Sequence, residues 1–180
     1  MMIPGCGFRF MSQNQLQRRQ VTLFLPEPES LPIEAIRQRF NPAQFALIAA
    51  HVTLIRDEDV PNWSRLRARA QRVASVDITL RFGAPIRQKN LVYLPSVGPT
   101  DDFDRLRREL LGDDHCRKQE PHISLIHPRN GKCDGEDFAA IKENMGNELC
   151  IRFQMMTFIE QLDGSAWRNV GSFPNCEPDS

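Results

Sequence analysis

Two short stretches of the chain share one pattern, His51-Val-Thr-Leu-Ile55 and His122-Ile-Ser-Leu-Ile126. In each, a hydroxyl residue follows a histidine by two positions, and apolar residues fill the other positions. Runs rich in β-branched and apolar residues favour a strand, in which successive side chains point to opposite faces. The imidazole and the hydroxyl of each stretch are therefore predicted to share one face, roughly 6–7 Å apart along the backbone.

The sequence around the two motifs follows the same order twice. Apolar periodicity and turn residues predict a strand, a helix, the motif strand, a helix and a closing strand in each half. Pro26 and Pro95 lie 69 positions apart, and the motif histidines lie 71 positions apart. A nearly constant offset indicates a duplicated unit. The predicted strands cover 21–25, 45–55, 76–82, 91–94, 122–127, 149–162 and 166–173, and the predicted helices cover 31–40, 62–74, 101–111 and 135–145.

These elements predict an α+β fold with a single bilobal domain over residues 21–175. Its two pseudo-repeats span about 21–83 and about 90–173. Each repeat is too short to bury a good core by itself, so we expect the halves to pack together. Residues 1–20 are interpreted as a polar leader, because they lack the basic and apolar regions of a signal peptide.

The composition is that of an ordinary globular protein and favours no particular partner. Of 180 residues, 41% are hydrophobic and 26% are charged, with 23 basic and 23 acidic side chains. Attraction to a phosphate must therefore come from a local arrangement of charge. No apolar run approaches the roughly 18 residues of a membrane span, so we expect no membrane association. Five cysteines without a C-x-x-C pair suggest reduced thiols and a cytoplasmic protein.

The two motifs suggest acid–base chemistry on a phosphodiester. If the halves face each other, one imidazole can take a proton from the attacking oxygen while the other protonates the leaving oxygen. The unperturbed pKa of histidine, about 6.5, leaves both forms accessible near neutral pH. The hydroxyls of Thr53 and Ser124 can donate hydrogen bonds to the non-bridging phosphate oxygens. His51 and His122 are the predicted catalytic residues.

The pair His-Val-Thr-Leu and His-Ile-Ser-Leu, with the duplicated order, resembles the signature of the 2H phosphoesterase superfamily, which includes 2′-5′ RNA ligase-like proteins and cyclic phosphodiesterases. The resemblance implies two antiparallel sheets forming a central groove, with helices on the outside. It also implies action on a 2′,3′-cyclic phosphate or 2′-5′ linkage, in an RNA end or a small cyclic nucleotide, without a metal or other cofactor. By motif position, the catalytic histidines of the family correspond to His51 and His122, and its phosphate-binding hydroxyls to Thr53 and Ser124.

Four further residues are candidates for substrate binding. Arg56 and Arg129 follow the two motifs closely, within reach of a phosphate or nucleotide. Strict alternation points Arg56 away from the motif face, however, and favours a solvated strand end. Phe24 and Tyr93 lie on the repeat-equivalent first strands and could stack on a base. Core packing is an equally good interpretation of both rings.

Two groups of side chains can be interpreted either as ordinary structural residues or as functional ones. The arginines of the predicted helices are expected on solvated faces, with an RNA-binding surface as the alternative; they are Arg65, Arg67, Arg69, Arg72, Arg105, Arg107 and Arg108. A zinc site would need His115, Cys116, His122 and His127, but their spacing matches no familiar zinc pattern. His115 and His127 are therefore expected in surface or loop positions.

Two alternative functions remain open beside hydrolysis. The same cleft could belong to a non-catalytic module that binds RNA ends or nucleotides. It could also join 2′-5′ ends without ATP, as the reverse of the same reaction. No Gly-rich phosphate loop or nucleotidyl-transfer lysine motif points to an ATP-dependent ligase.

Overall fold

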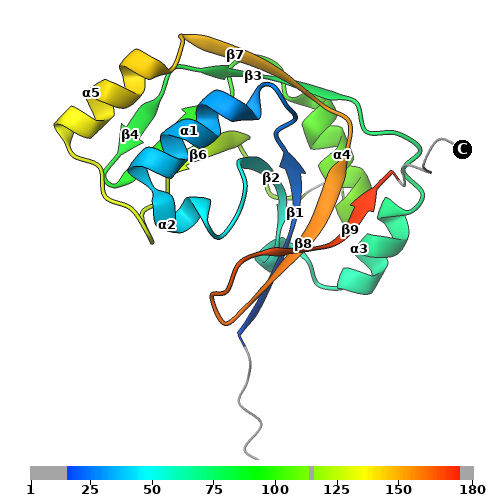
Figure 1. Ribbon diagram of the computed structural model, residues 1–180. Coiled ribbons are helices and arrows are strands. Elements are labelled where there is room, and N and C mark those ends of the chain that lie inside the picture. The colour runs from blue at the N-terminus through cyan, green and yellow to red at the C-terminus, as the bar shows by residue number, and fades with distance from the viewer. Residues whose placement is uncertain (1–15, 114–115, 175–180) are drawn as a thin grey trace, which may run out of the picture.

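Seven strands form one antiparallel sheet in the order β4-β5-β6-β2-β1-β8-β9, and β3 and β7 form a separate two-stranded sheet (Figure 1). The computed structural model describes residues 16–113 and 116–174. Within these ranges no helix is long and apolar enough to span a membrane. The elements are β1 (Gln17–Phe24), α1 (Ser30–Phe40), α2 (Pro42–Phe45), β2 (His51–Arg56), the 3₁₀ helix η1 (Asp57–Asp59), α3 (Trp63–Ala70), β3 (Ile78–Gly83), β4 (Ile86–Gln88), β5 (Leu91–Pro95), α4 (Asp101–Leu111), β6 (His122–Ile126), α5 (Gly135–Asn144), β7 (Glu148–Phe153), β8 (Met156–Leu162) and β9 (Arg168–Phe173).

The α+β class is confirmed, and strands from the two expected halves pair with each other in both sheets. The motif strands β2 and β6 are neighbours in the large sheet, where Val52 pairs with Ile123. The small sheet pairs β3 of the first half with β7 of the second over six residue pairs. The two sheets are thus unequal, and each contains strands from both halves. The duplication itself stays a prediction.

Several predicted elements differ from the observed ones; the helix predicted over 62–74, for example, covers only Trp63–Ala70. The run 149–162 was expected as one strand, but it is divided into β7 and β8, because its first part pairs in the small sheet and its second part in the large one. The strand expected from residue 45 begins only at His51. Pro42 starts the short helix α2, and the chain after Phe45 continues as a turn. β1 begins at Gln17, inside the segment interpreted as a leader, because its backbone pairs with β8 from that residue onward.

Local sequence signals set several helix ends. The side chains of Asn62 and Asp134 accept hydrogen bonds from backbone N–H groups three residues later, at 2.9 and 2.8 Å, and so cap α3 and α5. Gly112 ends α4 with a φ of 65°, a left-handed conformation that favours glycine, as the sequence predicts.

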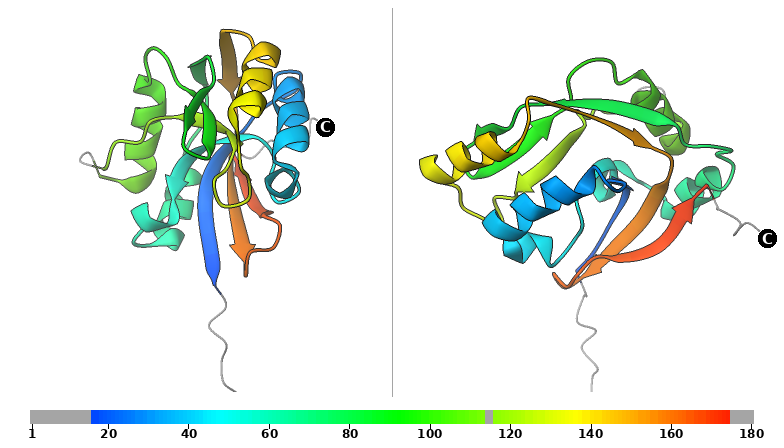
Figure 2. Two further views of the ribbon diagram at one scale, coloured as in Figure 1. Left: turned by 90° about the vertical axis from the view of Figure 1, so that its left-hand side faces the viewer. Right: turned by 45° about the horizontal axis from the view of Figure 1, so that its top comes forward.

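The core lies behind the motif face of the large sheet. The apolar residues of the two motif strands have no exposed surface, and helices lie against these strands: α1 packs against β6, while α4 packs against β2 and β3. Two groups of helices, α1, α2 and α5 on one side and α3 and α4 on the other, flank the strands (Figure 2). The motif side chains are thereby left on the opposite, open face. The buried motif-strand residues are Val52, Leu54, Ile55, Ile123, Leu125 and Ile126.

Candidate active site

The four motif side chains meet in one cavity. His51, Thr53, His122 and Ser124 all line a cavity of about 850 Å³, which we call the motif cavity. In both strands the histidine and the hydroxyl residue are half-buried, and the residue between them is buried. The alternation predicted from the sequence therefore brings two imidazoles and two hydroxyls to a common space. Their catalytic roles stay a prediction.

Each motif histidine is oriented by a backbone carbonyl two residues before it. Nδ1 of His51 lies 2.8 Å from the Ala49 carbonyl oxygen, and Nδ1 of His122 lies 3.1 Å from that of Glu120. A carbonyl oxygen only accepts, so Nδ1 carries the hydrogen and Nε2 of the neutral ring bears the free lone pair. In His51 this Nε2 lies 3.3 Å from the side-chain nitrogen of Gln20, which donates to it.

The environment of His51 favours the neutral imidazole. The pKa of His51 is lowered to about 4, chiefly by burial of the ring and to a lesser extent by the nearby positive charge of Arg37. The hydrogen bond to the Ala49 carbonyl acts in the opposite direction but is the smaller effect. His51 is therefore uncharged at neutral pH and able to accept a proton.

A buried arginine fixes the chain that enters the first motif. Arg37 of α1 is 2% exposed and donates to the Ile48 carbonyl at 2.6 Å. It also pairs at 2.5 Å with Glu34, which accepts a hydrogen bond from the Ala50 N–H. The residues on both sides of the Ala49 carbonyl are thus held by one ion pair on α1.

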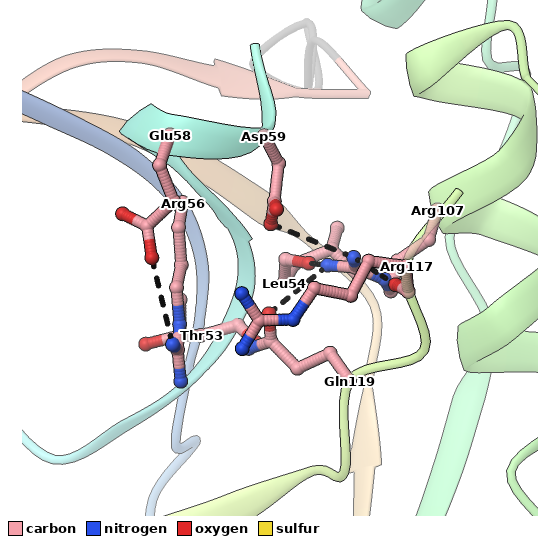
Figure 3. A network of polar contacts seen from close by, with 8 residues as sticks. All are labelled: Thr53, Leu54, Arg56, Glu58, Asp59, Arg107, Arg117 and Gln119. Carbon is pink, nitrogen blue, oxygen red and sulfur yellow. Dashed lines mark hydrogen bonds and ion pairs between the residues drawn. The ribbon is translucent and has the colours of Figure 1, made fainter.

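A second buried arginine fixes the chain that enters the second motif (Figure 3). Arg107 of α4 is 1% exposed and donates to the backbone carbonyls of Leu54 and Arg117 and to the side-chain oxygen of Gln119. Its guanidinium also lies 3.6 Å from the Asp59 carboxylate. Gln119 in turn donates to the Thr53 carbonyl at 2.7 Å. This network ties the segment before His122 directly to the first motif strand.

The two anchors correspond in position as well as in role. Arg37 and Arg107 lie 70 positions apart, which matches the offset of the motifs. The prediction of a solvated helix face is wrong for Arg107. The charge pattern of the helix was misleading because all the partners of Arg107 lie outside its own helix. Arg69 also differs from the prediction of a solvated helix face, since its guanidinium donates to the Leu110 and Leu111 carbonyls at the end of α4.

A bulge reverses the expected direction of Arg56. In the pairing of β1 with β2, Val21 faces Ile55 and Thr22 faces Thr53, so Leu54 has no partner. One additional residue shifts the alternation, and Arg56 returns to the face of His51 and lines the motif cavity. Strict alternation was therefore the wrong basis for placing Arg56 away from this face.

The second motif strand has a bulge at the equivalent place. In the pairing of β5 with β6, Val92 faces Ile126 and Tyr93 faces Ser124, so Leu125 has no partner. The next side chain, His127, lines the motif cavity rather than an unrelated surface loop. Its pKa is lowered, chiefly by burial and then by the charges of Arg129 and Arg18. The signal in the sequence is that Arg56 and His127 each lie five positions after a motif histidine.

The remaining candidates occupy three different places. Arg129 lines the motif cavity. Phe24 lies edge-on to the His51 ring at 6.1 Å between ring centroids and lines neither of the cavities described here. Tyr93 makes the equivalent contact with His122 at 5.6 Å, and it lines a second cavity of about 520 Å³. Only Tyr93 of the two aromatic candidates therefore borders a space that a base could enter.

The residues of the motif cavity that were not predicted from the sequence include two in the polar first part of β1 and one just before β9. Arg18 and Gln20 belong to the part of β1 that was interpreted as a leader, yet both line the motif cavity. Trp167, over whose ring the Arg18 guanidinium lies at 5.4 Å, lines it as well. The polar run Gln17–Gln20 has no alternation, so the sequence carried no clear signal that these residues continue the strand.

Within the described ranges, no group of three or more histidine, cysteine or acidic side chains is arranged to hold a metal ion. His115, one of the four residues considered for zinc, lies outside them.

Paired His-x-hydroxyl strands beside one cavity of an α+β fold define the class of two-histidine phosphoesterases. The chain belongs to the 2′-5′ RNA ligase superfamily, whose family model matches residues 25–128. This span contains both motifs and confirms the resemblance that the motifs indicated. A comparison with curated proteins finds no match.

Solved structures share the fold at low sequence identity. LigT of E. coli in complex with phosphate is 16% identical, with a TM-score of 0.57 over 88% of this chain and 97% of its own. LigT in complex with 3′-AMP is 17% identical, with a TM-score of 0.57 over 87% and 96% of the two chains. A structure described as a phosphoesterase is 16% identical, with a TM-score of 0.57 over 88% of this chain and 98% of its own.

Replacing Arg107 by alanine is expected to destabilise the protein. The change leaves the Leu54 and Arg117 carbonyls and the Asp59 carboxylate without their donor, at a cost of about 2–4 kcal/mol in the free energy of unfolding. Arg108→Ala, on the exposed face of the same helix, should change this free energy by less than about 0.5 kcal/mol. Urea unfolding of both variants measures the difference, and equal stabilities would contradict the anchor.

His51→Gln is expected to reduce the loss of stability in mild acid. The folded-state pKa of His51 is about 4, below the value of about 6.5 for an unfolded chain. As the pH falls from about 6.5 to about 4, the unfolded state binds the proton first, and folding stability decreases. Melting temperatures at pH 7 and pH 4.5 should therefore differ less in His51→Gln than in the wild type. An unchanged difference would show that this ring does not titrate as described.

Proposed function

We propose that this protein is a phosphodiesterase that opens 2′,3′-cyclic phosphates or cleaves 2′-5′ linkages in RNA or small nucleotides, using His51 and His122 and no metal ion. One observation carries the proposal: both imidazoles are fixed through Nδ1 and line a cavity that also receives two hydroxyls. Membership of the 2′-5′ RNA ligase superfamily supports this class of activity. LigT, which has been crystallised with phosphate and with 3′-AMP, supports a nucleotide phosphate as the ligand.

The proposed reaction assigns the base to His51. Its neutral Nε2 takes a proton from a water molecule as the water oxygen forms a bond to phosphorus. The bond from phosphorus to one ring ester oxygen breaks, and protonated His122 gives its Nε2 proton to that oxygen. The product is a phosphomonoester with a free hydroxyl beside it. The low pKa of His51 keeps it competent as a base into mildly acidic solution.

Thr53 and Ser124 are proposed to bind the non-bridging phosphate oxygens. Each hydroxyl lies on the same strand face as its motif histidine, so both can donate toward a phosphate between the rings. Arg56, Arg129 and His127 border the same cavity and supply further donors. Negative charge that develops on these oxygens is stabilised by donors held in place before the reaction.

We also infer that the site arose from a duplicated half. The motif histidines, the pair Arg56 and His127, and the buried arginines Arg37 and Arg107 recur at offsets of 70 or 71 positions. Each half would then supply one strand, one bulge and one anchor to a bilobal site. The cross-paired small sheet is compatible with this origin, because neither half buries a core alone.

His51→Ala and His122→Ala should each lower the rate of 2′,3′-cyclic nucleotide hydrolysis by about 10²–10⁴, because each removes one acid–base group. Product formation is measured by chromatography in the presence of EDTA, and unfolding curves verify that the variants fold. Full activity in either variant would exclude the proposed acid–base pair. Saturable binding of a nucleotide without turnover in the wild type would instead favour a binding module.

Thr53→Val should lower kcat for the same substrate by about 10²–10³ through loss of one donor to the developing charge. Thr53→Ser is the matched control, since it keeps the hydroxyl, and it should retain activity within about five-fold of the wild type. If the two variants lose activity equally, the hydroxyl is not the group that matters at this position.

A further inference from the structure

We propose that the 520 Å³ cavity beside the motif cavity binds the nucleotide adjacent to the reacting phosphate, so that the preferred substrate is single-stranded RNA rather than a mononucleotide. We call this space the strand cavity; its lining includes Tyr93, Ser96, Thr100, Arg117 and Lys118. The inference relies on the proposed function for the position of the phosphate, and it adds the class of substrate.

The two cavities adjoin at the site of chemistry. Arg56 and His122 line both of them. In a 2′,3′-cyclic phosphate both ester oxygens belong to one ribose, so the RNA strand continues from the 5′ oxygen of that ribose. With the phosphate beside His122, the strand can pass His122 and Arg56 into the strand cavity. A volume of about 520 Å³ lies within the range of roughly 300–1,000 Å³ that is typical of small-ligand sites.

Cationic side chains dominate the strand cavity in a way that suits a phosphate backbone. Arg56, Arg117 and Lys118 line it, and the Arg117 side chain extends toward Arg56 (Figure 3). Among the described residues, neither Arg117 nor Lys118 has an ion pair closer than 4 Å. Of the two acidic lining residues, Asp59 pairs with Arg107, and Glu120 offsets part of the positive charge. The Arg56 guanidinium lies 3.6 Å from the Glu58 carboxylate. A positive lining next to the reacting phosphate attracts a second phosphate of the same strand.

The other walls match the remaining parts of a nucleotide. Tyr93 is half-buried, with its ring bordering the cavity, and provides a surface on which a base can stack. The side chains of Gln88, Ser96 and Thr100 offer hydrogen-bonding groups for a sugar or a base edge. This combination of cations and one aromatic ring is typical of single-strand binding.

The cationic segment is held rigidly before any ligand arrives. The Arg117 carbonyl accepts from Arg107 at 3.0 Å, and the Pro121 carbonyl accepts from the Ser96 N–H at 3.0 Å. Gln119, between them, is bound to Arg107 and to the Thr53 carbonyl. A preorganised segment loses little entropy on binding, which favours a binding surface over an incidental collection of charges.

The experiment compares the affinity of the full-length protein for two ligands. One is a fluorescent RNA pentamer with a 3′-phosphate, and the other is a nucleoside 3′-monophosphate used as its competitor. The wild type should bind the pentamer at least about ten-fold more tightly at low salt. Lys118→Glu should weaken pentamer binding by about ten-fold and reduce the preference for pentamer over monophosphate. Arg72→Glu has the same change of charge at an exposed site outside both cavities, so it should leave both affinities within about two-fold.

Equal affinity of the wild type for the pentamer and the monophosphate would overturn the inference. The inference would also be overturned if Lys118→Glu kept the full preference for the pentamer over the monophosphate. The same holds if Arg72→Glu weakened pentamer binding as much as Lys118→Glu does. Because the readout is binding, these outcomes are separate from turnover. A protein that prefers the pentamer but hydrolyses no cyclic phosphate would contradict the proposed function and leave the strand cavity supported.

Discussion

The arrangement of the site depends on backbone carbonyls that are themselves fixed by buried guanidinium groups. The Ala49 and Glu120 carbonyls hold Nδ1 of the two motif histidines, and Arg37 and Arg107 hold the chain next to those carbonyls. Burying an arginine is costly unless its donors are satisfied. Here the terminal guanidinium nitrogens donate to backbone carbonyls and to the side chains of Glu34 and Gln119, while the buried Nε of Arg37 has no hydrogen-bond partner among the described residues. These bonds fix the chain that orients the two imidazole rings.

The same anchors explain why the two motifs stay together. β2 and β6 are joined by a very short pairing, at Val52 and Ile123, which by itself would leave the relative position of the strands weakly defined. Arg107 donates to the Leu54 carbonyl and to Gln119, and Gln119 donates to the Thr53 carbonyl. One buried network therefore joins the two motif strands and also fixes the segment before His122, which lines the strand cavity.

Sequence reasoning located the motif strands because the signal there is local. The alternation around His51 and His122 sets the face of each side chain, and the burial of the intervening residues agrees with it. The sequence could not reveal Arg107 as a buried residue, because its partners lie outside its helix and include Leu54 and Asp59 of the first half. It also misdirected Arg56, since a bulge depends on how the neighbouring strand pairs and not on the strand's own pattern.

The most direct test of this account is the tautomer of the two rings, read from long-range ¹H–¹⁵N NMR spectra of the ¹⁵N-labelled protein. In the neutral form of His51 and of His122, we expect the proton on Nδ1 and a bare Nε2. Spectra that place the proton on Nε2 of either neutral ring would contradict the carbonyl anchors, and with them the acid–base geometry proposed here.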